Sequence, residues 1–552
     1  MINLYPDGGE TGGPKRIEIL DTTLRDGAQG EGINFSPHDK IAVVYALDEL
    51  GVAWIEAGSP GSNPKDADFF LAAKGLSLEN SKLCAFGPTR KPDSSPEKDP
   101  QIRSLLEAGT EAVTIFGKSW NFHVREVLRV SPEENLAMIF ETVAYFKSRG
   151  KSVFFDAEHF FDGWKESPDY AIAAVNAASQ AGADRIVLCD TNGGSFPGDI
   201  SAAVAAALAA PWNVRLGIHA HNDAGLAIAN TLAAVQSGCL HVQGTVVGFG
   251  ERCGNTSLAS LIPSLELKLG YTCLPEGKLR RISEITRRIA ETANVPIPAT
   301  MPYVGSSAFS HKGGMHSDGV LKTPKSFEHV NPVSVGNDRR LLMSEVGGRS
   351  AIADRMRSID PSITREHPAV NILAEKLKSL EAAGWAFEGA VASFDLLVRR
   401  ELGRYKSLFR ILAYRVMSEH PTGESIACSH AWVKVWVDGQ DEIAAAEGNG
   451  PVHALDGALR RALVRFYPEL EHVRLTDYKV RVIDGGAATA AKVRVLIEST
   501  DGPRVWTTVG VSEDIIDASR SALVDSIECK LIGDIERNSG PKNGRRPEAS
   551  RP

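Results

Sequence analysis

The stretch "GIHAHNDAG" (Gly217 to Gly225) begins as an apolar run and ends in polar, reactive side chains. Successive side chains of a strand point to opposite faces, so His219 and His221 project from the same face. Much earlier, another apolar run is followed by "DTTLRDGAQG" (Asp21 to Gly30), which contains Asp26. Two imidazoles and one carboxylate can hold a divalent metal and leave positions open for substrate. The alternative is that the histidines are hydrogen-bonded residues at a strand end and Asp26 caps a turn.

Strand-like apolar runs alternate with helical patterns from about residue 16 to 270. The runs are Ile17–Leu20, Ala53–Ala57, Lys82–Phe86, Ala112–Phe116, Ser152–Asp156, Arg185–Cys189, Arg215–His219 and His241–Thr245. Between them, Ser36 and Ser131 are N-cap candidates for helices over Pro37–Leu50 and Pro132–Arg149. Eight β/α units in roughly 250 residues predict a TIM (β/α)8 barrel. A doubly wound sheet is disfavoured, because "TLRDGAQG" lacks the G-x-G-x-x-G turn.

Polar residues follow several of the predicted strands, at the ends where a TIM barrel builds its active site. Arg25 and Asp26 follow the first strand, Glu158 the fifth and Thr191 the sixth. The segment "GFGERCGN" (Gly248 to Asn255) follows the eighth. Random placement would scatter such residues over both ends of the barrel. Their collection at one rim favours a metal site over incidental histidines.

The bulk composition is that of an ordinary globular chain, with 43% hydrophobic and 24% charged residues among 552. The net charge of −8 argues against a general nucleic-acid binder. No run is long and apolar enough to cross a bilayer, so no membrane association is expected. Seven cysteines without a C-x-x-C pair indicate reduced thiols in a cytoplasmic protein.

The patterns predict four regions along the chain. These are a catalytic barrel (1–275), helical linker subdomains that contribute an active-site segment (276–407), a C-terminal α+β domain (408–537) and a disordered tail (538–552). The α+β domain offers no acid, base and metal cluster of its own, so regulation or assembly is expected of it.

The linker region contains "YVGSSAFSHKGGMHSDGVLK" (Tyr303 to Lys322), with His311 and His316 among glycines and small polar residues. This composition indicates a flexible segment that delivers a histidine to the active site. The alternative is a surface loop with incidental histidines.

Together, "TLRDG" and "HAHND" resemble the motifs of the DRE-TIM metallolyases, within them the acyl-CoA condensing enzymes that make 2-isopropylmalate, homocitrate and citramalate. The resemblance extends over nearly the whole chain, and the C-terminal domain looks like the family's effector-binding domain. The runs "GAQGEG", "SPGSNPKD" and "EGNGPVHALDGALRRAL" look most like the citramalate synthase branch.

The resemblance implies that Asp26, His219 and His221 are metal ligands and that Asn255 is a fourth polar group near the metal. The metal would be Mg²⁺, Mn²⁺ or Zn²⁺, since a carboxylate with imidazoles does not choose among them. The free ring nitrogens of the histidines need acceptors, for which the neighbouring Asn222 and Asp223 are candidates.

Catalytic roles are likewise implied for Arg25, Glu158, Thr191 and His316. Arg25 and Thr191 would contact the α-keto acid, and Arg25 would stabilise oxyanion charge. His316, whose ordinary pKa lies near neutrality, would take a proton from the acetyl-CoA methyl group, with Glu158 orienting it. From the residues alone, Glu158 could instead form a rim salt bridge and Thr191 could cap a turn.

One position departs from the family pattern. Where the family has a tyrosine downstream of the active-site histidine, this chain has Phe327 in "SFEHVNP". Either a neighbour such as His329 or Tyr303 supplies the hydroxyl or ring nitrogen, or the hydroxyl is dispensable.

The expected reaction is therefore a metal-dependent condensation of acetyl-CoA with pyruvate in isoleucine biosynthesis. The alternatives are a 2-isopropylmalate or homocitrate synthase, an aldolase or lyase of the same superfamily, and a non-catalytic metabolite sensor. By the resemblance, the protein would form a homodimer and bind isoleucine or leucine as effector. The glycine-rich turn "AEGNGP" (Ala446 to Pro451) opens a helix whose N-terminus could take the effector carboxylate.

Overall fold

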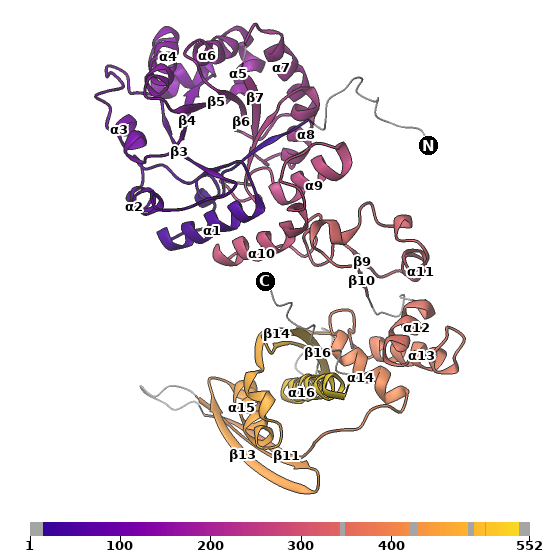
Figure 1. Ribbon diagram of the computed structural model, residues 1–552. Helices are drawn as coiled ribbons and strands as arrows, with labels where there is room; N and C mark the ends of the chain where they lie inside the picture. The colour runs from indigo at the N-terminus through magenta and orange to yellow at the C-terminus, as the bar shows by residue number, and fades with distance from the viewer. Residues whose placement is uncertain are drawn as a thin grey trace, which may run out of the picture. The chain divides into compact units, whose positions relative to one another are not determined.

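The computed structural model describes residues 15–212, 214–342, 348–419, 428–483, 491–502 and 504–539. The chain divides into two compact units (Figure 1). The first includes the described residues up to Phe309 together with His329–Arg339, and the second includes Ser310–Glu328 and the described residues from Arg340 on. The four regions expected from the sequence stay predictions. Of the expected disordered tail, residues 538 and 539 end a helix and the rest lies outside the described residues.

The first unit is built around a closed barrel of eight parallel strands in sequence order, which confirms the predicted TIM barrel. The strands are β1 (Glu18–Asp21), β2 (Trp54–Glu56), β3 (Lys82–Pro88), β4 (Ala112–Lys118), β5 (Ser152–Glu158), β6 (Arg185–Asp190), β7 (Arg215–Ala220) and β8 (His241–Gly244). The barrel closes where β1 pairs with β8, Glu18 opposite His241.

Helices follow the strands and form the outer ring in Figure 1. They are α1 (Pro37–Leu50), α2 (Pro64–Ala73), α3 (Pro100–Glu107), α4 (Pro132–Ser148), α5 (Phe160–Glu166), α6 (Pro168–Gln180), α7 (Pro197–Ala209), α8 (Ala227–Ser237), α9 (Leu258–Leu269) and α10 (Ile282–Thr292). Helix α1 begins as predicted: Ser36 accepts from the Asp39 amide, and the Asp39 carboxylate accepts from the Ser36 amide. Ser131 caps α4 through the Glu134 amide.

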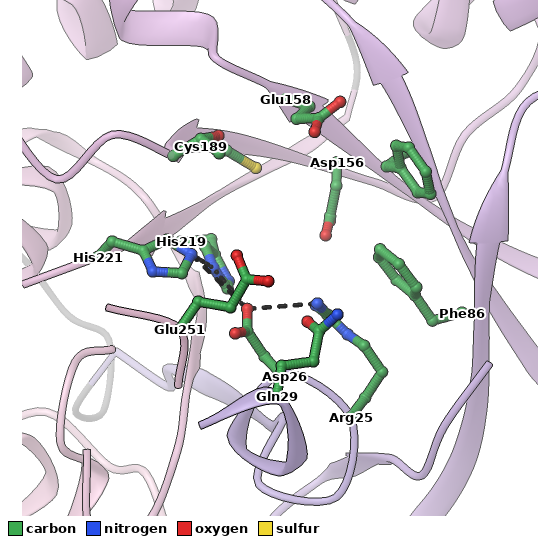
Figure 2. A pocket seen from close by; sticks show the side chains of 12 residues that line it. Arg25, Asp26, Gln29, Phe86, Asp156, Glu158, Cys189, His219, His221 and Glu251 are labelled. Carbon is green, nitrogen blue, oxygen red and sulfur yellow. Dashed lines mark hydrogen bonds and ion pairs between the residues drawn. The ribbon is translucent and has the colours of Figure 1, made fainter. Parts of the chain in front are cut away.

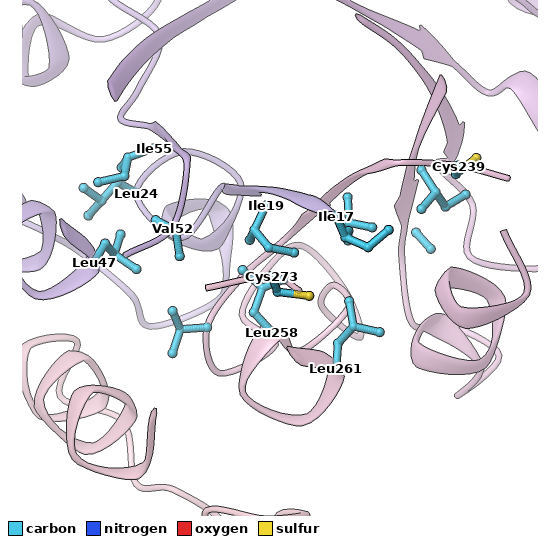
Figure 3. Packing of buried hydrophobic residues seen from close by; sticks show 14 of the residues in the cluster. Ile17, Ile19, Leu24, Leu47, Val52, Ile55, Cys239, Leu258, Leu261 and Cys273 are labelled. Atoms are coloured by element: carbon cyan, nitrogen blue, oxygen red, sulfur yellow. The ribbon is translucent and has the colours of Figure 1, made fainter. Parts of the chain in front are cut away.

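Alternation along the strands separates two apolar layers. Ile17 and Ile19 belong to the cluster between the barrel and its helices, together with Leu258 and Leu261 of α9 (Figure 3). Inward-facing Leu20 instead packs in a separate cluster with Trp54, Cys84, Ala112 and Phe154. Below that inner layer, Glu18 pairs with Arg185 and His241 at the N-terminal end of the barrel. These ion pairs fill the N-terminal end of the barrel, so an active site is expected at its C-terminal end.

The second unit starts with small elements and a helical group. Strand β9 (Ser310–His311) pairs with β10 (Arg340–Leu341) and is followed by α11 (Gly314–Lys322). The segment expected to be flexible thus contains a short strand and a helix. The helical group consists of α12 (Gly348–Ile359), α13 (Pro368–Ala382) and α14 (Val391–Glu401).

Two antiparallel three-stranded sheets complete the second unit, as the predicted α+β domain requires. One contains β11 (Arg410–Glu419), β12 (Cys428–Val437) and β13 (Gln440–Gly448), and α15 (Pro451–Val464) packs on it. The other contains β14 (Arg474–Val482), β15 (Val493–Thr500) and β16 (Val505–Ser512), and α16 (Ile515–Ser539) packs on it. Asp438 and Gly439 both have positive φ, as a two-residue hairpin turn demands.

Among the described helices, none has the length and apolar character to cross a membrane.

Candidate active site

A cavity of about 230 Å³ lies at the C-terminal ends of the barrel strands (Figure 2). Twelve residues line it: Arg25, Asp26, Gln29, Phe86, Phe116, Asp156, Glu158, Cys189, Thr191, His219, His221 and Glu251. Six of the eight residues selected from the sequence are among them. They come from the C-terminal ends of β5 and β7 and from the segments that follow β1, β6 and β7, so the folded barrel brings together positions that are far apart in the chain.

The Asp26 carboxylate faces both histidines. Its Oδ2 lies 3.3 Å from His219 Nε2 and 3.7 Å from His221 Nε2, and the two Nε2 atoms are 3.3 Å apart. Ligands at about 2.0–2.2 Å from one metal ion lie roughly 3.0–3.5 Å from each other. Burial would raise the pKa of Asp26, but Arg25 and His219 hold it well below its usual range, so the carboxylate is charged. The three side chains therefore fit a divalent metal without rearrangement of the backbone.

Gln243 of β8 fixes the orientation of His219. Its amide nitrogen donates to Asp156 Oδ1 at 2.9 Å, so its Oε1 is left to accept from His219 Nδ1, also at 2.9 Å. His219 Nε2 is then the ring nitrogen that faces Asp26. Burial would lower the pKa of His219, but the hydrogen bond to Asp26 and its charge raise it, so a metal ion at Nε2 would take the place of a proton. The sequence had suggested Asn222 or Asp223 for this role, and both suggestions are wrong for His219. Asn222 accepts from the Ala227 amide, and Asp223 accepts from Arg252.

His221 and Asn255 lie beside each other, because the two residues form an isolated β-bridge. Burial and the neighbouring His219 lower the pKa of His221 to about 4, so its imidazole is neutral near pH 7. Asn255 is buried and donates to the Phe249 carbonyl, and within the described parts of the chain its Oδ1 has no hydrogen-bond partner. A Cβ on Gly250 (φ 153°) would lie 2.1 Å from Asn255 Nδ2 and 3.3 Å from Asp26 Oδ1. Asn255 is thus packed close to the predicted metal ligand Asp26.

Arg25 is held in one orientation by three contacts. Its Nε donates to Glu56 Oε2 at 2.6 Å, its Nη1 lies 3.3 Å from Asp26 Oδ2, and its guanidinium stacks over the Phe86 ring at 3.8 Å. Burial would lower the pKa of Arg25, but Glu56 and Asp26 raise it above its usual value. A permanently charged donor therefore stands at the cavity beside the predicted metal ligands.

Glu158 forms an ion pair with Lys118, the last residue of the neighbouring strand β4. Both the rim salt bridge weighed from the sequence and the cavity position are thus present in the structure. The Thr191 hydroxyl accepts from the His159 amide at 2.9 Å, so it holds the turn after β5 as well as lining the cavity. These contacts leave the catalytic roles of Glu158 and Thr191 as predictions.

Sequence reasoning missed four cavity residues that the alternation of a strand could have found. Asp156 and Cys189 lie two positions before Glu158 and Thr191, so they point to the same inner face. Phe86 and Phe116 are inward-facing on adjacent strands, with ring centroids 5.1 Å apart. Burial and the nearby Glu56 raise the pKa of Asp156 to about 7.

His316 lies on α11 in the second unit, whereas the cavity is lined by the first unit alone. Phe327, which stands where the family has a tyrosine, stacks on the His316 ring with centroids 4.3 Å apart. Of the two suggested substitutes, Tyr303 hydrogen-bonds Ser264 through its hydroxyl, and its ring lies against His329. The delivery of His316 to the active site stays a prediction.

Known families and curated proteins match most of the length of the chain. Residues 16–289 match the HMGL-like family, residues 303–384 the homocitrate synthase post-HMGL domain-like family, and residues 388–531 the LeuA allosteric (dimerisation) domain. The chain is 49% identical to an (R)-citramalate synthase of Aquifex aeolicus, over 95% of this chain and 99% of that protein. It is 48% identical to an (R)-citramalate synthase of Geobacter sulfurreducens, over 93% and 97%. A probable 2-isopropylmalate synthase of Methanopyrus kandleri is 32% identical, over 93% and 98%. The chain therefore belongs to the (R)-citramalate synthase family.

Proposed function

We propose that this protein condenses acetyl-CoA with pyruvate and hydrolyses the resulting thioester, giving (R)-citramalate and free coenzyme A. The acetyl methyl carbon loses a proton and forms a bond to the keto carbon of pyruvate, whose oxygen becomes the product hydroxyl. Water then cleaves the thioester to a carboxylate and the coenzyme A thiol. The observation that carries the proposal is the convergence of Asp26, His219, His221 and Arg25 on one cavity.

Asp26, His219 and His221 would hold the divalent metal, with Asn255 beside them. When bound, such an ion polarises the keto group and orients the α-keto acid. The chain's own residues favour this occupancy: the Asp26 carboxylate is charged, His221 is neutral, and Gln243 keeps Nε2 of His219 facing Asp26.

Arg25 supplies the fixed positive charge next to the keto oxygen. Glu56 and Phe86 prevent it from swinging out of the cavity, so it needs no reorganisation when negative charge develops on that oxygen. Lys118 restrains Glu158 at the opposite side of the cavity, where it can orient a proton-transferring group. His316 is proposed as the base that takes the methyl proton.

The stacked pair Phe86 and Phe116 gives the cavity an apolar wall beside Arg25. A wall of two large rings suits an acceptor with a small alkyl group, so pyruvate is expected to be preferred. Coenzyme A release measured with pyruvate, 2-oxobutyrate, 2-oxoisovalerate and 2-oxoglutarate tests this. A higher kcat/KM with 2-oxoisovalerate than with pyruvate would contradict the proposal and favour a 2-isopropylmalate synthase.

The metal assignment has its own test. His221→Ala should abolish metal-dependent coenzyme A release while circular dichroism shows a folded protein. His38→Ala, which changes an exposed histidine of α1, is the matched control and should retain activity. Full activity of His221→Ala after exhaustive chelation would refute the assignment. Titration with Mg²⁺, Mn²⁺ and Zn²⁺ then identifies the preferred ion.

The match of residues 388–531 to the LeuA domain supports a homodimer regulated by a small molecule. We infer isoleucine as the first candidate effector and leucine as the second, as feedback on branched-chain amino-acid synthesis in the cytoplasm. Removing the C-terminal domain would not test the effector assignment cleanly, because helix α14 before it contacts α16 within it: Ser393 and Arg400 both donate to the buried Asp525. Inhibition of the full-length enzyme by each amino acid, with light scattering for the mass, tests both inferences. No response of activity to either amino acid would refute the effector assignment, and a monomeric mass would refute the dimer.

A further inference from the structure

The sheet formed by β11, β12 and β13 has one covered face and one open face. On β12 the buried residues Ala431, Val433, Val435 and Val437 belong to the apolar cluster that includes α15. The alternate residues of β12, beginning with Cys428 and His430, point to the opposite face. Where β12 begins, the open face holds polar and sulfur-containing side chains in place of the apolar ones of the covered face.

The strand register places five potential metal ligands or their partners on that open face. Glu419 lies opposite Cys428, and Met417 lies opposite His430. On the other side of β12, Glu447 lies opposite His430. Directly opposed residues of antiparallel strands share a face, as do residues two apart on one strand. A thiol, an imidazole, a thioether and two carboxylates therefore collect in one patch.

The ligand atoms of Glu419, Cys428 and His430 all lie within 4.8 Å of one another. Cys428 Sγ is 3.2 Å from His430 Nε2. Zinc bonds of about 2.3 Å to sulfur and 2.0–2.1 Å to nitrogen, at a tetrahedral angle, set these two atoms about 3.5 Å apart. Small side-chain rotations are enough to reach that separation, since Cys428 and His430 are only half-buried and Glu419 is exposed.

The second ring nitrogen of His430 also has a suitable neighbour. His430 Nδ1 lies 3.7 Å from Glu447 Oε1. A carboxylate at Nδ1 makes a histidine a better ligand through Nε2 and sets the plane of its ring. Glu419, His430 and Glu447 line a cavity of about 660 Å³, which leaves room for a water molecule as a fourth ligand.

We propose that Glu419, Cys428 and His430 bind a thiophilic divalent transition-metal ion, with Zn²⁺ as the favoured ion. A thiolate and an imidazole select Zn²⁺ over Mg²⁺ or Mn²⁺, so this site differs in chemistry from the Asp26 site. It differs from the expectation that the C-terminal domain has no acid, base and metal cluster of its own. The ion would join the end of β11 to the start of β12.

Cobalt substitution of the full-length protein tests the proposal, because a Co²⁺–thiolate bond gives a near-ultraviolet charge-transfer band that carboxylates and imidazoles do not give. The band should appear on addition of Co²⁺ to the metal-free protein and should disappear as Zn²⁺ displaces it. Cys428→Ser should abolish the band. Cys189→Ser is the matched control, because Cys189 is the thiol that lines the barrel cavity, and the band should persist in it.

Two further variants distinguish a metal site made of several ligands from metal binding by the Cys428 thiol alone. His430→Ala should lose the band or need far more Co²⁺ to reach it. Glu447→Gln should keep the band but weaken Co²⁺ binding about tenfold or more, since the carboxylate only orients the ring. No band in the wild-type protein, a band that survives Cys428→Ser, or one that vanishes in Cys189→Ser would each overturn the proposal. So would unchanged Co²⁺ affinity in His430→Ala.

Discussion

Gln243 is the residue whose replacement best tests how the barrel site is built. It is fully buried and makes two side-chain hydrogen bonds of 2.9 Å, one with His219 Nδ1 and one with Asp156 Oδ1. Gln243→Leu keeps the size of the side chain and removes both bonds. The His219 ring then loses the acceptor that directs its Nε2 toward Asp26.

The expected effects follow from those two bonds. Each buried polar group left without a partner costs about 1–3 kcal/mol, so His219 and Asp156 together predict a loss of roughly 2–6 kcal/mol in the free energy of unfolding. Removing the group that orients a metal-binding histidine typically weakens metal affinity by about 10–100-fold. Activity at low metal concentration should fall by a similar factor, and excess metal should restore part of it.

Mn²⁺ binding, followed through the electron paramagnetic resonance signal of the free ion, measures the affinity directly. Asn222→Ala is the matched control: its side chain accepts from the Ala227 amide at the start of α8, so its loss should cost about 1 kcal/mol of stability and leave Mn²⁺ affinity unchanged. If Gln243→Leu bound Mn²⁺ as tightly as the wild type, or if Asn222→Ala bound it more weakly, the assigned orientation of His219 would be wrong.

Three further substitutions test other parts of the barrel. Arg25→Lys should lower kcat nearly as much as Arg25→Ala, because an ammonium cannot reproduce the planar contacts of the guanidinium. The expected loss of transition-state stabilisation is on the order of 3 kcal/mol. Retention of most of kcat would show that charge alone matters. Burial raises the pKa of Glu18, but hydrogen bonds from Arg185 and His241 outweigh it and hold the pKa below its usual value. The stabilisation that comes from this lowered pKa is present above about pH 4.3 and is lost as the pH falls below that value. Glu18→Gln should therefore lower the free energy of unfolding at pH 7 by about 3 kcal/mol, measured as a lower Tm. In acid, the Tm of the variant should differ less from that of the wild type. Gly250→Ala should weaken Mn²⁺ binding without unfolding the barrel, because the added Cβ would displace Asn255; wild-type affinity would contradict that reading.

The sequence predicts the barrel and much of its rim for identifiable reasons. Helix α1 is bounded as expected because Ser36, Pro37 and Gly51 are local signals that act within one turn. The signals of each β/α unit also lie close together in the sequence, so eight such units in a row predict the barrel.

Contacts across the barrel are not local, and there sequence reasoning fails. Gln243 meets His219 through the register of β7 and β8, in which Ile218 lies opposite Val242, and no spacing in the chain encodes that register. Adjacency in sequence suggested Asn222 and Asp223 instead. The pairing of Glu419 with Cys428 likewise depends on the register of two strands.

The closure of the barrel between β1 and β8 has a consequence for how the protein is made. Asp26 follows the first strand, His219 lies in the seventh with His221 directly after it, and Asn255 follows the eighth. A ribosome must therefore release about half of the chain before the full ligand set can exist, and early β1 waits unpaired on one edge until β8 arrives. The proposed ion would bind only the closed form, so metal in the cell would stabilise the finished barrel by mass action. Metal starvation should then lower the yield of folded enzyme as well as its activity.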